Sequence, residues 1–244
     1  MDEAFNINTE YLTDAELEQL SKHLDKYKEL HERDELQGEF LKFVRHVWPS
    51  FIAGSHHKIF AEKLERVAKG ELKRLIVNMP PRHTKSEFAS YLFPAWVMGR
   101  SPHTKIIQAT HTAELAVGFG RKVKNLLDSE IYRDVFPEIE LARDAKASGR
   151  WSTNEGGEYY AVGVGGALAG RGANLCIIDD PVSEQDALSP TALDGIYEWY
   201  TSGPRQRLQP GGAIIIVMTR WSIRDLTAKV LQKQAEGGAD QWEV

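Results

Sequence analysis

A lysine and a serine stand where a helix is expected to begin, directly after a short apolar strand and a loop. The loop reads Pro80-Pro81-Arg82-His83-Thr84, and Lys85 and Ser86 follow it. Binding a nucleoside triphosphate requires backbone N–H groups at a helix start, a lysine for the outer phosphates and a hydroxyl for Mg²⁺. We therefore expect Lys85 to contact the β and γ phosphates of ATP and Ser86 to ligate the metal.

This loop departs from the usual phosphate-binding pattern, G-x-x-x-x-G-K-[ST]. Met79 occupies the first glycine position and Thr84 occupies the second. On Lys85 and Ser86 alone, an ordinary exposed helix start is the better interpretation. A nucleotide site therefore needs a second signal elsewhere in the chain.

The second signal is an acidic strand end. Residues 175–178, Leu-Cys-Ile-Ile, are followed by Asp179 and Asp180, and P-loop enzymes place such carboxylates opposite the lysine loop. We expect Asp179 to hold Mg²⁺ and Asp180 to orient the attacking water, with a shorter reach than the glutamate found in many such ATPases. Glu184 is a second candidate for that water, and the alternative for Asp180 is a turn former before Pro181.

Two further polar residues complete the predicted site. Thr219 ends an apolar strand and would contact the γ-phosphate or its water, although a packed strand threonine is the alternative. Arg171 lies in a glycine-rich stretch, 163–172, and would act as an arginine finger that completes a neighbouring subunit's site. Arg82 competes for that role, and a solvated arginine on a surface hairpin is the alternative for Arg171. The predicted ATP-binding residues are Pro81, Arg82, His83, Thr84, Lys85, Ser86 and Thr219; the metal ligands are Ser86 and Asp179; the catalytic residues are Asp180, Arg171 and Glu184.

The elements that position these residues are strands that alternate with helices. Apolar strands are predicted at 74–79, 104–110, 175–180 and 213–219, a further short strand at 159–162, and helices at 85–98, despite Pro94, and at 112–129. This alternation predicts an α/β fold with a mostly parallel central sheet flanked by helices. Ligands of such sheets lie beyond the carboxyl ends of the strands, so we expect Lys85 and Asp179 to meet there from adjacent strands.

The first part of the chain is predicted to be helical. Thr13 and Glu16 form a capping box, and apolar residues follow at helical spacing through Leu30. Helical spacing continues to Pro49, and another helix is expected at 57–69. We therefore predict an N-terminal helical subdomain or lid over residues 1–70 and an ATPase core over residues 71–244.

Composition excludes several classes of protein. The chain has 244 residues, a formal net charge of −5 and one cysteine, Cys176, so neither an internal disulfide nor redox chemistry is expected. We find no transmembrane run and no secretory signal, and we expect no membrane partner. The negative charge means that any DNA contact must be local or shared. The basic clusters 121–124 and 205–207 are candidates for it, although solvated helix faces look the same.

These segments together resemble a known family, the large terminase subunit of tailed bacteriophages, over residues 40–230. The similarity is carried by 70–77 leading into 80–86, by Gly170-Arg171-Gly172 before Ile177-Ile178-Asp179-Asp180-Pro181, and by Met218-Thr219-Arg220-Trp221. The resemblance implies an ASCE-type P-loop ATPase that uses ATP and Mg²⁺ to thread double-stranded DNA into a capsid. It also implies a homo-oligomeric ring on the capsid portal protein, a small terminase subunit as partner, and a location in the host cell cytoplasm during virion assembly.

The family normally carries a metal-dependent nuclease domain after the ATPase. This sequence ends at Val244, soon after the fourth strand, so we expect no nuclease activity from it. Two other functions remain open at this stage. One is a helicase or recombination motor with the same core, and the other is a nucleotide-gated binding module without efficient hydrolysis, which the missing loop glycines favour.

Overall fold

A six-stranded sheet lies at the centre of the molecule. The computed structural model describes residues 12–145, 147–237 and 240–244. In spatial order the strands are β1 (Arg74–Asn78), β6 (Leu208–Met218), β5 (Ala173–Asp179), β2 (Lys105–Thr110), β4 (Glu158–Gly163) and β3 (Arg150–Ser152). All neighbours are parallel except β3, which runs antiparallel to β4 at one edge. The predicted mixed α/β fold with a mostly parallel sheet is confirmed.

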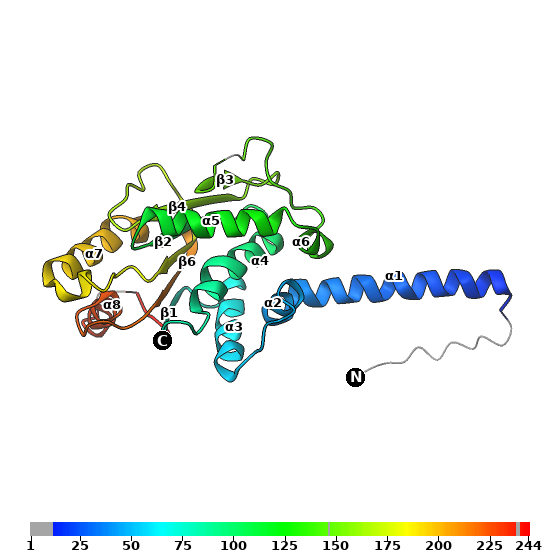
Figure 1. Cartoon of the computed structure of the whole chain (residues 1–244), viewed down its shortest axis with the longest axis horizontal. Helices are drawn as coiled ribbons and strands as arrows, with labels where there is room; N and C mark the ends of the chain where they lie inside the picture. The colour runs from blue at the N-terminus through cyan, green and yellow to red at the C-terminus, as the bar shows by residue number, and fades with distance from the viewer. Residues whose placement is uncertain (1–11, 146, 238–239) are drawn as a thin grey trace.

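Helices cover both faces of the sheet because its central strands are apolar on both sides. Successive residues of a strand point to opposite faces, so Ile177 and Ile215 belong to one core and Ile178 and Ile216 to the other. The first core lies under α3 (Ser55–Ala68), α4 (Phe93–Arg100) and α5 (Ala113–Leu127), beside α6 (Glu130–Val135) (Figure 1). The second core lies under α7 (Pro190–Ser202) and α8 (Leu226–Ala235). The short 3-10 turns η2 (Asp186–Leu188) and η3 (Pro204–Arg207) lie before and after α7 in the chain.

The strand order corrects one expectation. Strand β6 lies between β1 and β5, so the strands that precede Lys85 and Asp179 are not adjacent. Apolar strands of similar composition do not specify which of them pair, and the connections that decide the order are not visible in the strand residues themselves. The carboxyl ends nevertheless align, because Asn78 pairs with Met218 and Asp179 with Val217.

The helix after the lysine loop has an irregular first half. A π-helical segment, η1 (Glu87–Leu92), passes directly into α4 (Phe93–Arg100). Pro94 lacks a backbone N–H, and in a regular helix its ring would collide with the carbonyl of Ser90. The wider π turn before Pro94 removes this conflict, so the helix continues through the proline as predicted.

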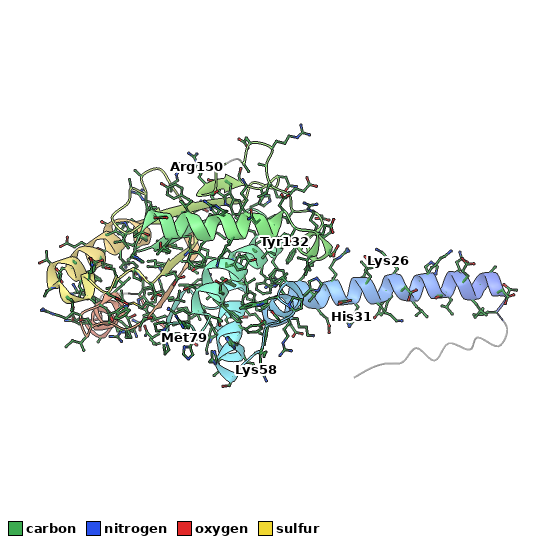
Figure 2. The ribbon with its side chains drawn as sticks, in the orientation of Figure 1. Lys26, His31, Lys58, Met79, Tyr132 and Arg150 are labelled. Carbon is green, nitrogen blue, oxygen red and sulfur yellow. The ribbon has the colours of Figure 1, made fainter. Side chains whose placement is uncertain are left out.

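The N-terminal helices are α1 (Asp14–Gly38), α2 (Phe40–Val47) and α3 (Ser55–Ala68), and the Thr13–Glu16 capping box is present. Side chains of α2 and α3 share the first core with α4 and the sheet. Helix α1 projects from the body of the molecule, and Figure 2 shows Lys26 and His31 on the projecting part. Residues 1–11 of the predicted N-terminal region lie outside the described residues, and the boundary at residue 70 stays a prediction.

The carboxyl-terminal end of α1 is fixed to the body by three hydrogen bonds. Arg33 Nε donates to the Asp134 carbonyl over 3.0 Å and Gln37 Nε2 to the Val135 carbonyl over 2.6 Å. The indole of Trp96 donates to the Leu36 carbonyl over 3.0 Å. Among the helices that the structure describes, none is long and apolar enough to cross a membrane.

Candidate nucleotide site

The predicted lysine loop meets the acidic strand end at the carboxyl edge of the sheet. Lys85 begins the helix after β1, and its side chain is 6% exposed. Its Nζ lies 2.8 Å from Oδ2 of Asp180. A buried ammonium group is tolerated only with a partner of opposite charge, so Asp180 holds Lys85 in this position. The structure therefore brings the two sequence signals together.

Asp179 is surrounded by hydroxyl groups. Ser86 Oγ donates to Oδ1 over 3.0 Å and Ser90 Oγ donates to Oδ2 over 2.7 Å. Behind Ser90, the amide of Gln108 donates to Ser90 Oγ over 3.0 Å. Sequence reasoning missed Ser90 and Gln108. The available signal was Gln108 itself, a polar residue in the middle of a predicted strand.

The carboxyl of Asp179 is strongly affected by its surroundings. Burial, reinforced by the negative charge of Asp180, raises its pKa to about 7. The hydrogen bonds from Ser90 and Ser86 and the charge of Lys85 act in the opposite direction and lower the pKa. Burial is the largest of these effects, so the ionised form of Asp179 is destabilised without a cation beside it.

Asp180 joins three strand ends through one carboxylate. Its Oδ2 accepts from Lys85, which follows β1, and its Oδ1 accepts from the backbone N–H of Thr219, which follows β6, over 2.7 Å. The hydroxyl of Thr219 donates to the Met79 carbonyl over 3.3 Å. Asp180 therefore holds the end of β6 in place and also lines the pocket at the predicted nucleotide site. A structural role and the predicted catalytic role are compatible for this residue.

Backbone strain is concentrated here. Among the described residues, those other than glycine with positive φ are Arg82 (63°), Thr84 (60°) and Asp180 (41°). Each such conformation costs about 1–3 kcal/mol and persists only where the surroundings enforce it, which is common at functional sites. Thr84 stands at a position where the usual pattern has glycine, and it adopts the left-handed conformation that glycine adopts readily.

A pocket of about 430 Å³ opens beside this constellation. Pro81, Asp180, Glu184 and Thr219 are among its lining residues, together with Trp221. Glu184 is exposed at the pocket wall, whereas Asp180 is tied to Lys85. The structure therefore brings both candidate carboxylates to one pocket, and which of them orients water stays a prediction.

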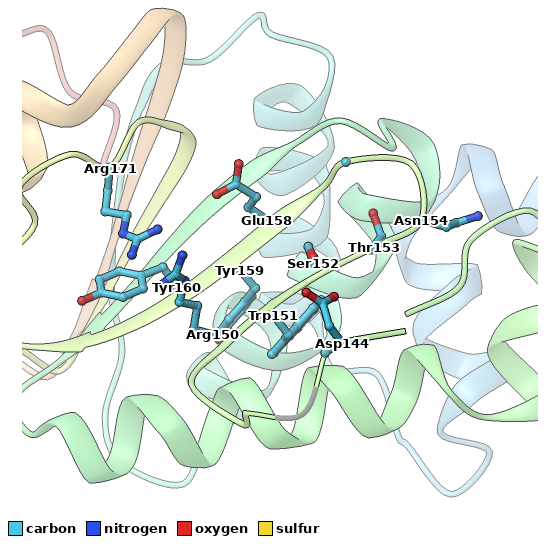
Figure 3. A pocket seen from close by; sticks show the side chains of 12 residues that line it. Asp144, Arg150, Trp151, Ser152, Thr153, Asn154, Glu158, Tyr159, Tyr160 and Arg171 are labelled. Atoms are coloured by element: carbon cyan, nitrogen blue, oxygen red, sulfur yellow. The ribbon is translucent and has the colours of Figure 1, made fainter. Parts of the chain in front are cut away.

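Arg171 lies elsewhere. It precedes β5, whose seven residues separate it from Asp179, which is roughly 25 Å at about 3.3 Å per residue. Its guanidinium lies 4.9 Å from the ring centre of Tyr160, beside Arg150, at a second pocket of about 550 Å³ (Figure 3). Arg171 does not join its own chain's lysine loop, and a role in a neighbouring subunit stays a prediction. Arg82, the competing candidate, is exposed in the lysine loop.

The two basic clusters are partly neutralised within the chain. Lys122 pairs with Glu87 over 2.8 Å, and Lys124 donates to the Ala145 carbonyl. Arg205 pairs with Asp240 over 3.0 Å. These local partners favour the interpretation that the clusters are largely structural.

The donor set fits Mg²⁺ better than a transition metal. Within the described part of the chain, no group of three or more His, Cys, Asp or Glu side chains is arranged to hold a metal ion. Mg²⁺ does not need such a cage, because it usually takes one or two carboxylates, waters and substrate phosphates. Ser86 Oγ and Asp179 Oδ1, 3.0 Å apart, are hard oxygen donors beside the lysine loop.

Comparison with solved structures finds one of similar fold. The chain is similar to a solved structure, the crystal structure of the HK97 bacteriophage large terminase, with a TM-score of 0.50 and 13% sequence identity. The similarity covers 77% of this chain and 37% of that terminase. No protein-family model and no curated protein sequence matches the chain. At this identity the likeness shows the fold alone.

Proposed function

We propose that this chain is the ATP-hydrolysing motor of a viral DNA-packaging terminase, with an ASCE-type P-loop core. One observation carries the proposal. Lys85 and Ser86 after β1 meet Asp179 and Asp180 at the end of β5, with β6 between the two strands. The terminase-like fold supports the proposal, and so does the residue order on which the sequence resemblance rests.

In the proposed reaction, water attacks the γ-phosphate of ATP. Lys85 neutralises charge on the β and γ phosphates, while the backbone N–H groups of 82–86 bind the phosphate oxygens. Mg²⁺, held by Ser86 and Asp179, supplies further positive charge beside the phosphates. Asp180 accepts a hydrogen bond from the attacking water once Lys85 has turned to the phosphates, and Thr219 contacts the γ-phosphate from the end of β6.

The partners follow from the terminase proposal. The chain acts on double-stranded DNA as a homo-oligomeric ring on the capsid portal protein, with a small terminase subunit, in the host cell cytoplasm. Arg171, remote from its own chain's lysine loop, completes the site of a neighbouring subunit. Its partly exposed position beside Tyr160, at the edge of a pocket, supports this assignment. Isolated chains are then poor ATPases that gain activity on assembly.

The proposal is tested by phosphate release from ATP, with Mg²⁺, DNA and portal present. Lys85→Ala removes the phosphate contact, and we expect it to reduce the rate by about a hundredfold or more. Lys233→Ala is the matched control, because this lysine lies exposed on α8, away from the lysine loop, and forms an ion pair with Glu236 at the end of the helix. Wild-type rates from the Lys85→Ala protein would exclude the assigned site.

The same assay separates the alternatives. A nucleotide-gated binding module would bind Mg-ATP without releasing phosphate under any of these conditions. The missing loop glycines favour that function, but Thr84 already has the backbone conformation of a glycine, which weakens the argument. A helicase or recombination motor would instead separate strands in a DNA-stimulated and portal-independent manner.

A further inference from the structure

Thr84 has a backbone conformation that its side chain disfavours. Its φ is +60°, and a β-branched residue in this region collides with its own backbone more than other residues do. Left free, Thr84 would relax toward negative φ and carry the following turn with it. That turn begins with Lys85, so the position of the lysine depends on whatever holds Thr84.

The hydroxyl of Thr84 is held by His57. His57 Nε2 lies 2.6 Å from Thr84 Oγ1, and Nδ1 of the same ring accepts the backbone N–H of Gly54 over 2.9 Å. Because Nδ1 accepts, the neutral ring carries its proton on Nε2 and donates it to Thr84 Oγ1. The Thr84 hydroxyl in turn donates to the His83 carbonyl over 2.7 Å. The hydrogen bonds therefore run in one direction from Gly54 to the loop.

The imidazole itself is fixed in place. Phe88 stacks on it with ring centres 5.1 Å apart, and Phe51 meets it edge-on at 4.8 Å. Only 7% of His57 is exposed. His57 lies in the first turn of α3, whereas Phe88 belongs to the segment after the lysine loop. The ring thus connects an N-terminal helix to the loop on which Lys85 depends.

We propose that His57 is a positioning residue of the phosphate loop, holding Thr84 by its hydroxyl in the conformation that glycine supplies in the usual pattern. The loop then presents its N–H groups and Lys85 without the second glycine. The effect of His57 on nucleotide binding rests on the proposed function. Its effect on the conformation of the loop is a property of the nucleotide-free protein, so the two effects are tested separately.

The hold on the loop is tested by a double-mutant cycle without nucleotide. His57→Phe keeps an aromatic ring between Phe51 and Phe88 but loses both nitrogens, and Thr84→Gly removes the hydroxyl together with the strain. We expect His57→Phe to accelerate amide hydrogen exchange in residues 82–88 by about fivefold, the loss of one hydrogen bond. In the Thr84→Gly background it should have no such effect. Equal acceleration by His57→Phe in the wild-type and Thr84→Gly backgrounds would show that His57 does not act through the Thr84 hydroxyl.

Two control variants accompany this cycle. His23→Phe makes the same change at an exposed histidine of the projecting helix α1 and should leave exchange in residues 82–88 unchanged. Thr84→Ser keeps the hydroxyl and should retain wild-type exchange. Exchange in Thr84→Ser as fast as in the double variant His57→Phe/Thr84→Gly would also count against the role of the hydroxyl.

The effect on nucleotide is tested by the affinity for a non-hydrolysable ATP analogue with Mg²⁺. We expect His57→Phe to weaken binding by about fivefold, and Thr84→Gly to abolish that dependence. In steady-state hydrolysis the change should fall on KM rather than on kcat, because His57 does not touch the reacting atoms. If the wild type binds no analogue, the proposed function fails, and the exchange cycle still decides whether His57 holds the loop. Unchanged affinity in an analogue-binding His57→Phe protein would overturn the positioning role.

Discussion

Replacing Asp179 with asparagine should stabilise the nucleotide-free protein. The carboxyl is 2% exposed, and burial raises its pKa from 3.8 to about 7. Asparagine has nearly the same shape and can still bond to Ser86 and Ser90, but it does not carry the buried negative charge. The substitution therefore removes a group whose ionisation opposes folding at neutral and higher pH.

The magnitude follows from the difference between the two pKa values. A folded-state pKa of about 7 against 3.8 in the unfolded chain corresponds to about 4 kcal/mol in total. Because the folded pKa is the higher one, this contribution is fully present below pH 3.8 and is lost as pH rises through 7. When the pH is lowered from 8 to 5, Asp179 adds about 3 kcal/mol to the free energy of unfolding of the wild type. The asparagine in Asp179→Asn does not titrate and adds nothing.

Urea unfolding of both proteins at pH 8 and pH 5, without metal or nucleotide, measures this difference. We expect Asp179→Asn to gain stability relative to the wild type at pH 8, by about 3 kcal/mol more than at pH 5. The comparison cancels the other titrating groups. Asp128→Asn is the control, because that carboxylate is 70% exposed and paired on the surface. A relative stability that does not change with pH would refute the buried-charge reasoning.

Two further predictions concern neighbours of Asp179. Asp180→Ala should reduce phosphate release by about a hundredfold, whereas exposed Glu184→Ala should reduce it by less than about tenfold; the reverse order, measured in the same assay, would assign the water to Glu184. Ser90→Ala should lower the free energy of unfolding by about 1–3 kcal/mol, because it leaves both Asp179 and the Gln108 amide without their buried partner. Urea unfolding measures this loss, and an unchanged midpoint would mean that the hydrogen bonds of Ser90 with Asp179 and Gln108 do not stabilise the fold.

Sequence patterns predicted the sheet well where strands are long and apolar. The runs at 74–79 and 104–110 contain β1 and β2, and the runs at 175–180 and 213–219 cover the carboxyl-terminal parts of β5 and β6. The short edge strand β3 was not predicted, since three residues carry no periodicity. Helices α7 and α8 were also missed. They follow the site motifs closely and carry a single apolar stripe over one face of the sheet.

The predicted site residues are those whose positions follow from the ends of the strands. Lys85, Ser86, Asp179 and Asp180 were predicted because each follows a strand, and parallel strands end at one edge. Ser90 reaches Asp179 from the π-helical segment before Pro94, an irregular turn that sequence patterns did not predict. His57 was not assigned to the loop because its contact with Thr84 depends on how α3 packs against the lysine loop. Such contacts depend on tertiary packing that local patterns do not contain.

The residues at the carboxyl edge of the sheet lower the stability of the fold, which favours a functional role for them. This reasoning does not depend on the 13% identity to a solved terminase. Three non-glycine residues adopt left-handed backbone, and a buried carboxyl and a buried ammonium lie among them. Each of these features destabilises the folded protein; glycine would avoid the cost at the strained positions, and apolar side chains would avoid it at the buried charged ones. The isoleucine-rich cores on both sides of the sheet offset the cost. A gain of stability in Asp179→Asn together with a loss of nucleotide binding would show that the carboxylate is retained for binding.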